Sequence, residues 1–165
     1  MSFLNWLEET AFSQWVVTSG YAWILTLHTI GMTIVAGIAF VLALRLLGLS
    51  PGTPVKPLDR LFPIIWWGFG LNALTGTMLL IADASTKLTN PDFYVKMVFV
   101  AIGITVLVRM RRTVFRDPKL DEGGLPRSAK GLAWVSLAAW VAAITAGRLL
   151  AYLGPVSGAK GLVNR

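Results

Sequence analysis

The sequence predicts an all-α integral membrane protein: a four-helix bundle that follows an N-terminal interfacial amphipathic helix. Of its 165 residues, 55% are hydrophobic and only 14% are charged, whereas about 25% of the residues in soluble domains are charged. Mean hydropathy is +0.67. The chain has no cysteine, which excludes disulfides, thiolate metal sites and thiol redox chemistry. Without an internal repeat or a second domain, residues 1–165 are expected to form a single transmembrane domain.

Four apolar windows are long enough to cross a hydrocarbon core about 30 Å thick, which takes about 20 helical residues. They lie at about 21–47, 62–83, 93–115 and 130–153. The first ends before the breaker stretch 48–52, and the second opens at Pro63, a position that the first turn of a helix tolerates. The third follows Asn90-Pro91-Asp92, whose side chains can cap a helix start, and the fourth follows the polar loop 117–130.

Residues 3–17 are predicted to form a helix that lies flat at the membrane interface. Its apolar residues recur at helical spacing with polar residues between them: Phe3, Leu7, Ala11 and Trp15. Glu8 and Glu9 stand where a cleavable signal peptide requires a basic segment, so the segment is not expected to be one.

The lysines and arginines predict the orientation, because cytoplasmic loops carry most of them. Ten of the fifteen lie in or beside the loops after the first and third spans, and five lie on the other side. We therefore expect a multi-pass protein of the bacterial inner (cytoplasmic) membrane with both termini in the periplasm. The net charge of +7 is explained by this topology, so the expected partners are the lipid bilayer and other membrane subunits or a homo-oligomer, and not nucleic acid.

Ionisable side chains within a span cost roughly 2.5–3.5 kcal/mol at its centre, so each one indicates a functional site. This chain places four of them in the outer half of the predicted bundle: His28, Asp83, Lys96 and Arg148. His28 is the only histidine, and it lies about 10 Å below the outer surface at 1.5 Å per residue. A neutral imidazole binds haem iron and also copper, so His28 is the candidate metal ligand.

The neighbouring residues favour a haem b-like cofactor. Lys96 and Arg148 are placed to pair with its two propionates. One face of the second span carries Asn72, Gly76 and Asp83. Gly31 lies one turn below His28, and small residues of this kind allow a flat ring or a neighbouring helix to approach.

Structural roles compete with each of these assignments. Lys96 and Arg148 are near enough to the interface to snorkel, and Arg148 can pair with Asp83. His28 can donate a hydrogen bond to a carbonyl or a threonine instead of binding a metal. With one histidine, two imidazole ligands within one chain are excluded, so a second ligand is absent, comes from Met78 or Met97, or comes from another subunit.

Several short motifs, taken together, resemble those of an uncharacterised family of small bacterial four-span membrane proteins. They include Leu27-His28-Thr29-Ile30-Gly31 in the first span and Gly147-Arg148-Leu149-Leu150-Ala151-Tyr152 in the fourth. More distantly, the chain is similar to the CopD-type copper-resistance proteins and the HemJ-type protoporphyrinogen oxidases, which are four-helix membrane proteins. That similarity implies a haem site at the positions of His28 and Lys96.

The sequence therefore predicts a membrane protein that binds a haem b-like cofactor in its periplasmic half and acts in electron transfer or haem handling. One alternative is a non-enzymatic accessory subunit of a larger membrane complex that binds lipid or quinone. Another is a transporter for copper or a small solute. The residues required for hydrolases and ATPases are missing, no catalytic residue is predicted, and whether the protein is an enzyme stays open.

Overall fold

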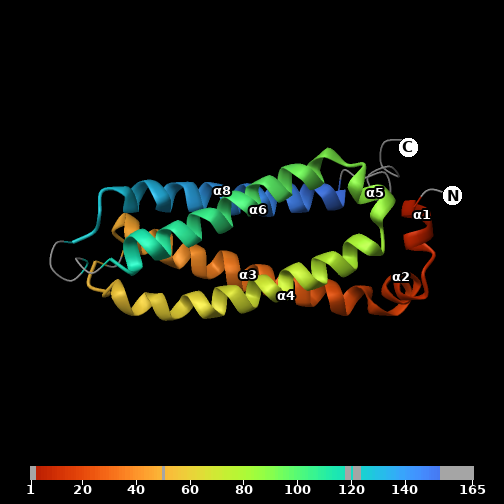
Figure 1. The fold of residues 1–165 in the computed structure, drawn as a ribbon, viewed down its shortest axis with the longest axis horizontal. Coiled ribbons are helices and arrows are strands. Elements are labelled where there is room, and N and C mark those ends of the chain that lie inside the picture. The colour runs from red at the N-terminus through yellow and green to blue at the C-terminus, as the bar shows by residue number, and fades with distance from the viewer. Residues whose placement is uncertain (1–2, 50, 118–119, 121–123, 153–165) are drawn as a thin grey trace.

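Four long helices run side by side in the computed structural model, which describes residues 3–49, 51–117, 120 and 124–152 (Figure 1). They are α3 (Tyr21–Leu47), α4 (Phe62–Ile81), α6 (Pro91–Met110) and α8 (Ser128–Tyr152). All regular structure in the described residues is helical, which confirms the predicted all-α class. Each long helix, with its continuations, is long and apolar enough to cross a membrane.

The helix ends follow local signals in the sequence. α3 stops at Gly48, whose φ of 105° is left-handed and suits glycine at a helix C-terminus. α6 begins two residues earlier than expected because the side chain of Asn90 accepts a hydrogen bond from the backbone N–H of Asp92, at 2.9 Å. A π-helical turn, Arg111–Phe115, continues α6 to the expected end. Leu153, the last residue of the predicted fourth span, lies outside the described residues.

The expectation of one helix over residues 3–17 is wrong. The structure has two short helices instead, α1 (Phe3–Glu8) and α2 (Ala11–Trp15). Thr10 separates them, because its side chain accepts a hydrogen bond from the backbone N–H of Ser13 and so starts a new helix. A π-helical turn, Val16–Gly20, then joins α2 to α3.

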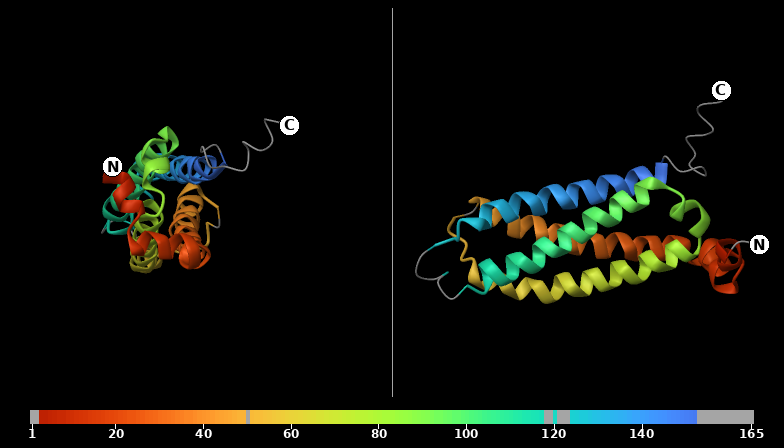
Figure 2. Two further views of the ribbon diagram at one scale, coloured as in Figure 1. Left: turned by 90° about the vertical axis from the view of Figure 1, so that its right-hand side faces the viewer. Right: turned by 45° about the horizontal axis from the view of Figure 1, so that its top comes forward.

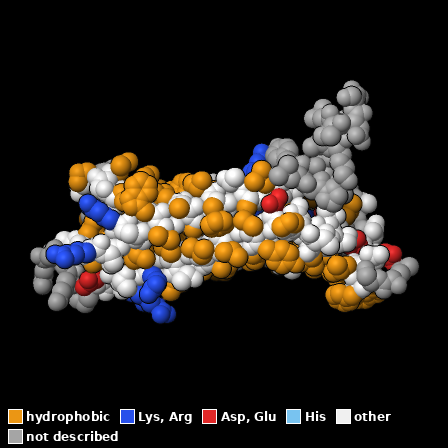
Figure 3. All heavy atoms as spheres, turned by 90° about the horizontal axis from the view of Figure 1, so that it is seen from above, with side chains coloured by type: hydrophobic (Ala, Val, Ile, Leu, Met, Phe, Trp, Pro, Cys, Tyr) orange, Lys and Arg blue, Asp and Glu red, His pale blue; other side chains and the backbone are white. Residues whose placement is uncertain are grey.

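The four helices occupy the corners of a square when the molecule is viewed along its length (Figure 2). α3 packs along α4 and α8, and α8 packs along α6. We call the end where α3 and α6 finish the basic end, and the end that holds α1, α2 and α5 (Ala84–Leu88) the α5 end. Hydrophobic side chains cover much of the middle of the surface in Figure 3, and most of the visible lysines and arginines lie toward the basic end.

The apolar core is concentrated toward the basic end. Its large cluster draws on all four long helices, with Leu42, Phe62, Leu107 and Ala133 among its fully buried members. A second, smaller cluster lies toward the α5 end and consists of Val16, Ile24, Leu79 and Ala82, with Met78 packed against them. Within the described residues, neither α6 nor α8 contributes to this second cluster.

A contact between α1 and α5 closes the α5 end. The Glu8 carboxylate accepts a hydrogen bond from the backbone N–H of Ser85, at 2.7 Å from Oε1 to N. This bond favours the charged form, and it lowers the pKa of Glu8 from its ordinary value. The short helix α5 was not predicted from the sequence, since only two residues separate it from the end of α4.

Candidate functional site

His28 lies on the side of α3 that faces α4, and only 9% of its surface is exposed. Its Nδ1 atom is 3.0 Å from the backbone oxygen of Asn72 and 3.1 Å from Oγ1 of Thr75. Since a carbonyl oxygen can only accept, Nδ1 must carry a hydrogen. In the neutral ring, Nε2 then has the lone pair, and no residue in the described part of the chain forms a hydrogen bond with Nε2.

Thr75 supports the same assignment of the His28 hydrogen. Its hydroxyl donates to the backbone oxygen of Leu71, at 2.7 Å. Because that bond uses the single hydroxyl hydrogen, Oγ1 is left to accept from Nδ1 of His28. The imidazole is therefore held from one side by two acceptors on α4, which fixes the direction in which Nε2 points.

Asn72 of α4 also donates a hydrogen bond to α3. Its Nδ2 donates to the backbone oxygen of His28, at 2.7 Å. Two glycines allow this close approach of the helices: a Cβ at Gly31 would lie 2.9 Å from the backbone oxygen of Gly68, and a Cβ at Gly76 would lie 3.0 Å from Cε1 of His28. The backbone of α4 thus fills the space beside Gly31, and the imidazole fills the space beside Gly76.

Lys96 lies in the first half of α6 and is half-buried. The end of its side chain runs past Gly147 of α8, where a Cβ would lie 3.6 Å from its Cδ and Cε atoms and 3.8 Å from Nζ. Lys96 is near enough to interact electrostatically with His28. Its ammonium forms no hydrogen bond or ion pair with the residues that the structure describes.

The structure places the other two ionisable residues differently. Asp83 pairs with Lys87, at 3.4 Å between Oδ2 and Nζ, and Nζ also donates to the backbone oxygen of Leu79 at 2.6 Å. Arg148 is exposed on α8, directly after Gly147. Lys87 itself was missed by the sequence analysis, yet it interacts electrostatically with both His28 and Lys96. Lys87 lies in the loop between two predicted spans, and this position gives no indication of its interactions with His28 and Lys96.

The sequence analysis also missed three buried polar atoms that lack a hydrogen-bond partner in the described structure. They are the hydroxyls of Ser13 and Ser136 and the indole nitrogen of Trp140. Trp140 packs against Gly103, where a Cβ would lie 2.9 Å from its Cε2. Spacing along one helix does not reveal such pairs, because they depend on the register between α6 and α8.

His28 offers one imidazole donor, Nε2, to a metal or to a cofactor that contains one. No group of three or more His, Cys, Asp or Glu side chains that could hold a metal ion occurs among the described residues. A porphyrin supplies four nitrogen ligands, so one imidazole suffices to attach its iron to the protein. No family model matches the chain, and neither does any characterised protein or solved structure.

Proposed function

We propose that this chain is a four-helix-bundle protein of the bacterial inner membrane that binds a haem b-like cofactor near its α5 end and acts in electron transfer or haem handling. The observation that carries the proposal is the hydrogen bonding of His28. Metal-binding histidines commonly donate their other ring N–H to a backbone carbonyl, which fixes the ring and raises its basicity. The Nδ1 contact with the Asn72 oxygen has this form.

The membrane setting rests on the surface and the charges. The four candidate spans carry apolar side chains that would face lipid, including Trp67, Leu74 and Trp134. The positive-inside rule assigns the basic end to the cytoplasm, since cytoplasmic loops are rich in lysine and arginine. Both termini and the α5 end then face the periplasm, and the exposed aromatic rings of Phe3 and Trp6 lie at the outer interface.

Each residue of the site has a distinct task in this proposal. His28 would hold the haem iron through Nε2, while Asn72 and Thr75 keep the ring in position. Lys96 supplies a positive charge for a carboxylate, and this would give a partner to an ammonium that otherwise lies inside a span. When bound, haem supplies a reversible one-electron couple. Since the chain has one histidine, a second imidazole ligand would have to come from another subunit.

An optical spectrum of the full-length protein from native membranes tests the proposal. The oxidised protein is expected to show a Soret band that shifts on reduction with dithionite and is lost in His28→Ala. Asn72→Ala is the matched control, because it removes the bond to the His28 carbonyl but keeps the backbone oxygen that accepts from Nδ1. This variant should keep the band.

A colourless but intact protein, or an unchanged spectrum in His28→Ala, would overturn the proposal. The function would then be that of an accessory subunit, with His28 joining α3 to α4 by hydrogen bonds alone. Copurification of other membrane proteins with the colourless chain would support that alternative, and copper uptake that depends on expression of the chain would support transport.

A further inference from the structure

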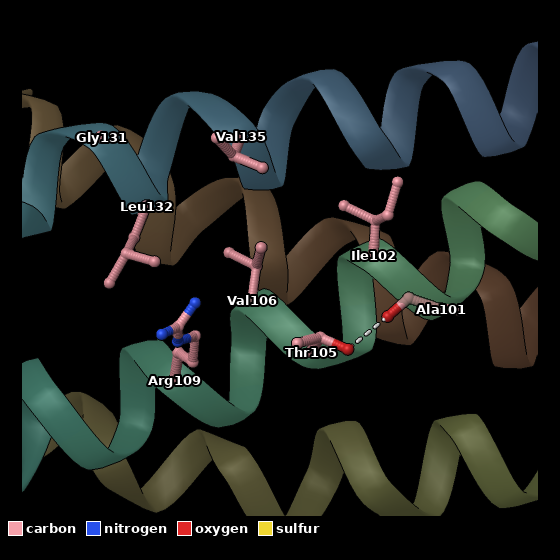
Figure 4. Close-up of a pocket in the computed structure, with 8 residues that line it drawn as sticks. All are labelled: Ala101, Ile102, Thr105, Val106, Arg109, Gly131, Leu132 and Val135. Atoms are coloured by element: carbon pink, nitrogen blue, oxygen red, sulfur yellow. Dashed lines mark hydrogen bonds between the residues drawn. The ribbon is translucent and has the colours of Figure 1, made fainter.

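A shallow groove runs between α6 and α8 toward the basic end, far along the chain from His28 (Figure 4). Residues from Ala101 to Arg109 form its wall on α6, and residues from Gly131 to Val135 form its wall on α8. The side chains of Ile102, Val106 and Leu132 point into the space between the two helices in Figure 4. Ala101, Ile102 and Arg109 are exposed, so the groove opens on the outer surface of the helix pair.

The walls of the groove suit a hydrocarbon chain. Its one hydroxyl group, on Thr105, donates back to the oxygen of Ala101 at 2.8 Å, so it is already satisfied within α6. On the opposite wall, a Cβ at Gly131 would meet no atom within 4 Å. The groove is therefore apolar and locally deepened by the missing side chain of this glycine.

A positive charge lies at the end of the groove nearest the basic end. Arg109 extends from α6 toward α8 in Figure 4, is exposed, and makes no side-chain hydrogen bond or ion pair with the described residues. Lys130 precedes Gly131 at the start of α8 and is also exposed. By contrast, Arg111 is already bound to Asp59, at 2.9 Å. Arg109 lies about 9 Å inside the end of its span, within reach of the interface for a long side chain.

We propose that this groove binds one phospholipid with an anionic head group, with an acyl chain between α6 and α8 and the phosphate on Arg109. An apolar groove that ends at a guanidinium with no partner among the described residues is complementary to a lipid chain attached to a phosphate. The guanidinium is suited to phosphate oxygens because it presents several N–H donors in one plane. The site is independent of the proposed haem site, so His28→Ala should leave lipid binding unchanged.

Native mass spectrometry of the full-length protein in detergent tests this site. Phosphatidylglycerol and phosphatidylcholine with identical chains are added in turn. The unaltered protein is expected to retain one phosphatidylglycerol in preference to phosphatidylcholine. Arg109→Gln should weaken phosphatidylglycerol binding about fivefold, the effect of about one basic residue near an anionic lipid surface. Gly131→Leu should reduce the binding of both lipids, because its side chain fills the groove.

Two matched controls separate the groove from general effects of charge and size. Arg60→Gln removes an exposed charge at the same end of the molecule, from the segment before α4. Gly70→Leu adds the same side chain to α4, where a Cβ also meets no atom within 4 Å. Both variants should bind phosphatidylglycerol as the unaltered protein does. Should Gly131→Leu fail to fold, Ile102→Trp fills the groove from the opposite wall.

Three results would overturn the proposal. The first is equal retention of the two lipids by the unaltered protein. The second is an unchanged phosphatidylglycerol affinity in Arg109→Gln. The third is a loss of binding in Arg109→Gln with full binding in the groove-filling variant, because the head group would then be held without a chain in the groove.

Discussion

The side chains of His28 and Asn72 each form a hydrogen bond with the backbone oxygen of the other residue. The distances are 3.0 Å from Nδ1 of His28 and 2.7 Å from Nδ2 of Asn72. Both bonds join α3 to α4, so the orientation of the imidazole depends on the packing of this helix pair. A substitution of His28 changes the candidate site and the helix contact together, whereas Asn72→Ala removes one of the two bonds and keeps the backbone acceptor of Nδ1.

Asn72→Ala should lower the free energy of unfolding by about 0.5–1.5 kcal/mol, the range of hydrogen bonds between helices in membranes. The variant loses the bond to the His28 oxygen, while the backbone acceptor of Nδ1 remains. Thermal unfolding in detergent measures the change. Thr77→Ala is the control, because this exposed hydroxyl bonds only within α4, to the oxygen of Ala73. Equal stability of the two variants would contradict an interhelical role for Asn72.

Gly31→Ala should destabilise the protein by about 1–3 kcal/mol, as overpacking does in a tight core. The added Cβ would lie 2.9 Å from backbone atoms of Gly68 and Asn72, which cannot rotate away. Gly37→Ala on the same helix meets no atom within 4 Å, and it should be neutral or stabilise by up to about 1 kcal/mol. Thermal unfolding of both variants checks the contrast. A Gly31→Ala protein as stable as Gly37→Ala would mean that α3 and α4 are farther apart.

Lys96→Met should weaken haem binding while leaving the haem-free protein at least as stable as before. The reason is that the Lys96 ammonium has no partner among the described residues, yet it lies within a span, where a charge is costly. Haem titration measures the first effect and thermal unfolding of the haem-free protein measures the second. Arg60→Met, at an exposed position outside the long helices, is the control for a general loss of charge. If Lys96→Met destabilises the haem-free protein and binds haem normally, Lys96 has a structural role.

The contact between α1 and α5 should weaken in acid. The pKa of Glu8 is lowered in the folded protein by its bond with the Ser85 N–H, so this carboxylate contributes stability above its unfolded pKa. That contribution is lost as the pH falls through the lowered folded pKa, below about 4.5. The protection of the Ser85 amide against hydrogen exchange, relative to its intrinsic exchange rate at each pH, should therefore fall as the pH drops below about 4.5.

Glu8→Gln should abolish most of this pH dependence, because an amide does not titrate. Glu9→Gln serves as the control, since its side chain makes no hydrogen bond or ion pair with the described residues. Ser85 exchange that responds to acid equally in Glu8→Gln and in the unaltered protein would exclude the Glu8 carboxylate as its cause.

Periodicity and hydropathy predicted the four long helices because each of them carries apolar side chains over many consecutive turns. The break at Thr10 was not predicted, since one threonine cap interrupts an apolar pattern that itself continues to Trp15. The short helix α5 was not predicted either, because its segment is too short to show a periodic apolar pattern.

For the candidate site, the sequence identified His28 and Lys96 as ionisable groups inside spans. It did not predict that Nδ1 of His28 meets the oxygen of Asn72, or that Lys96 passes Gly147. These contacts depend on how the helices are rotated and shifted relative to one another, which spacing within a single helix does not determine. Asp83 shows the same limit, because its ion-pair partner is Lys87, one turn away along the chain.

The unequal distribution of the apolar core has a consequence for motion. Segments with few buried apolar contacts open at a lower free energy than well-packed ones. The large cluster near the basic end should therefore keep all four helices together while the α5 end opens locally. Such local opening would allow haem to enter the bundle without global unfolding. Amide exchange along α6 should then become slower from Lys96 toward Leu107.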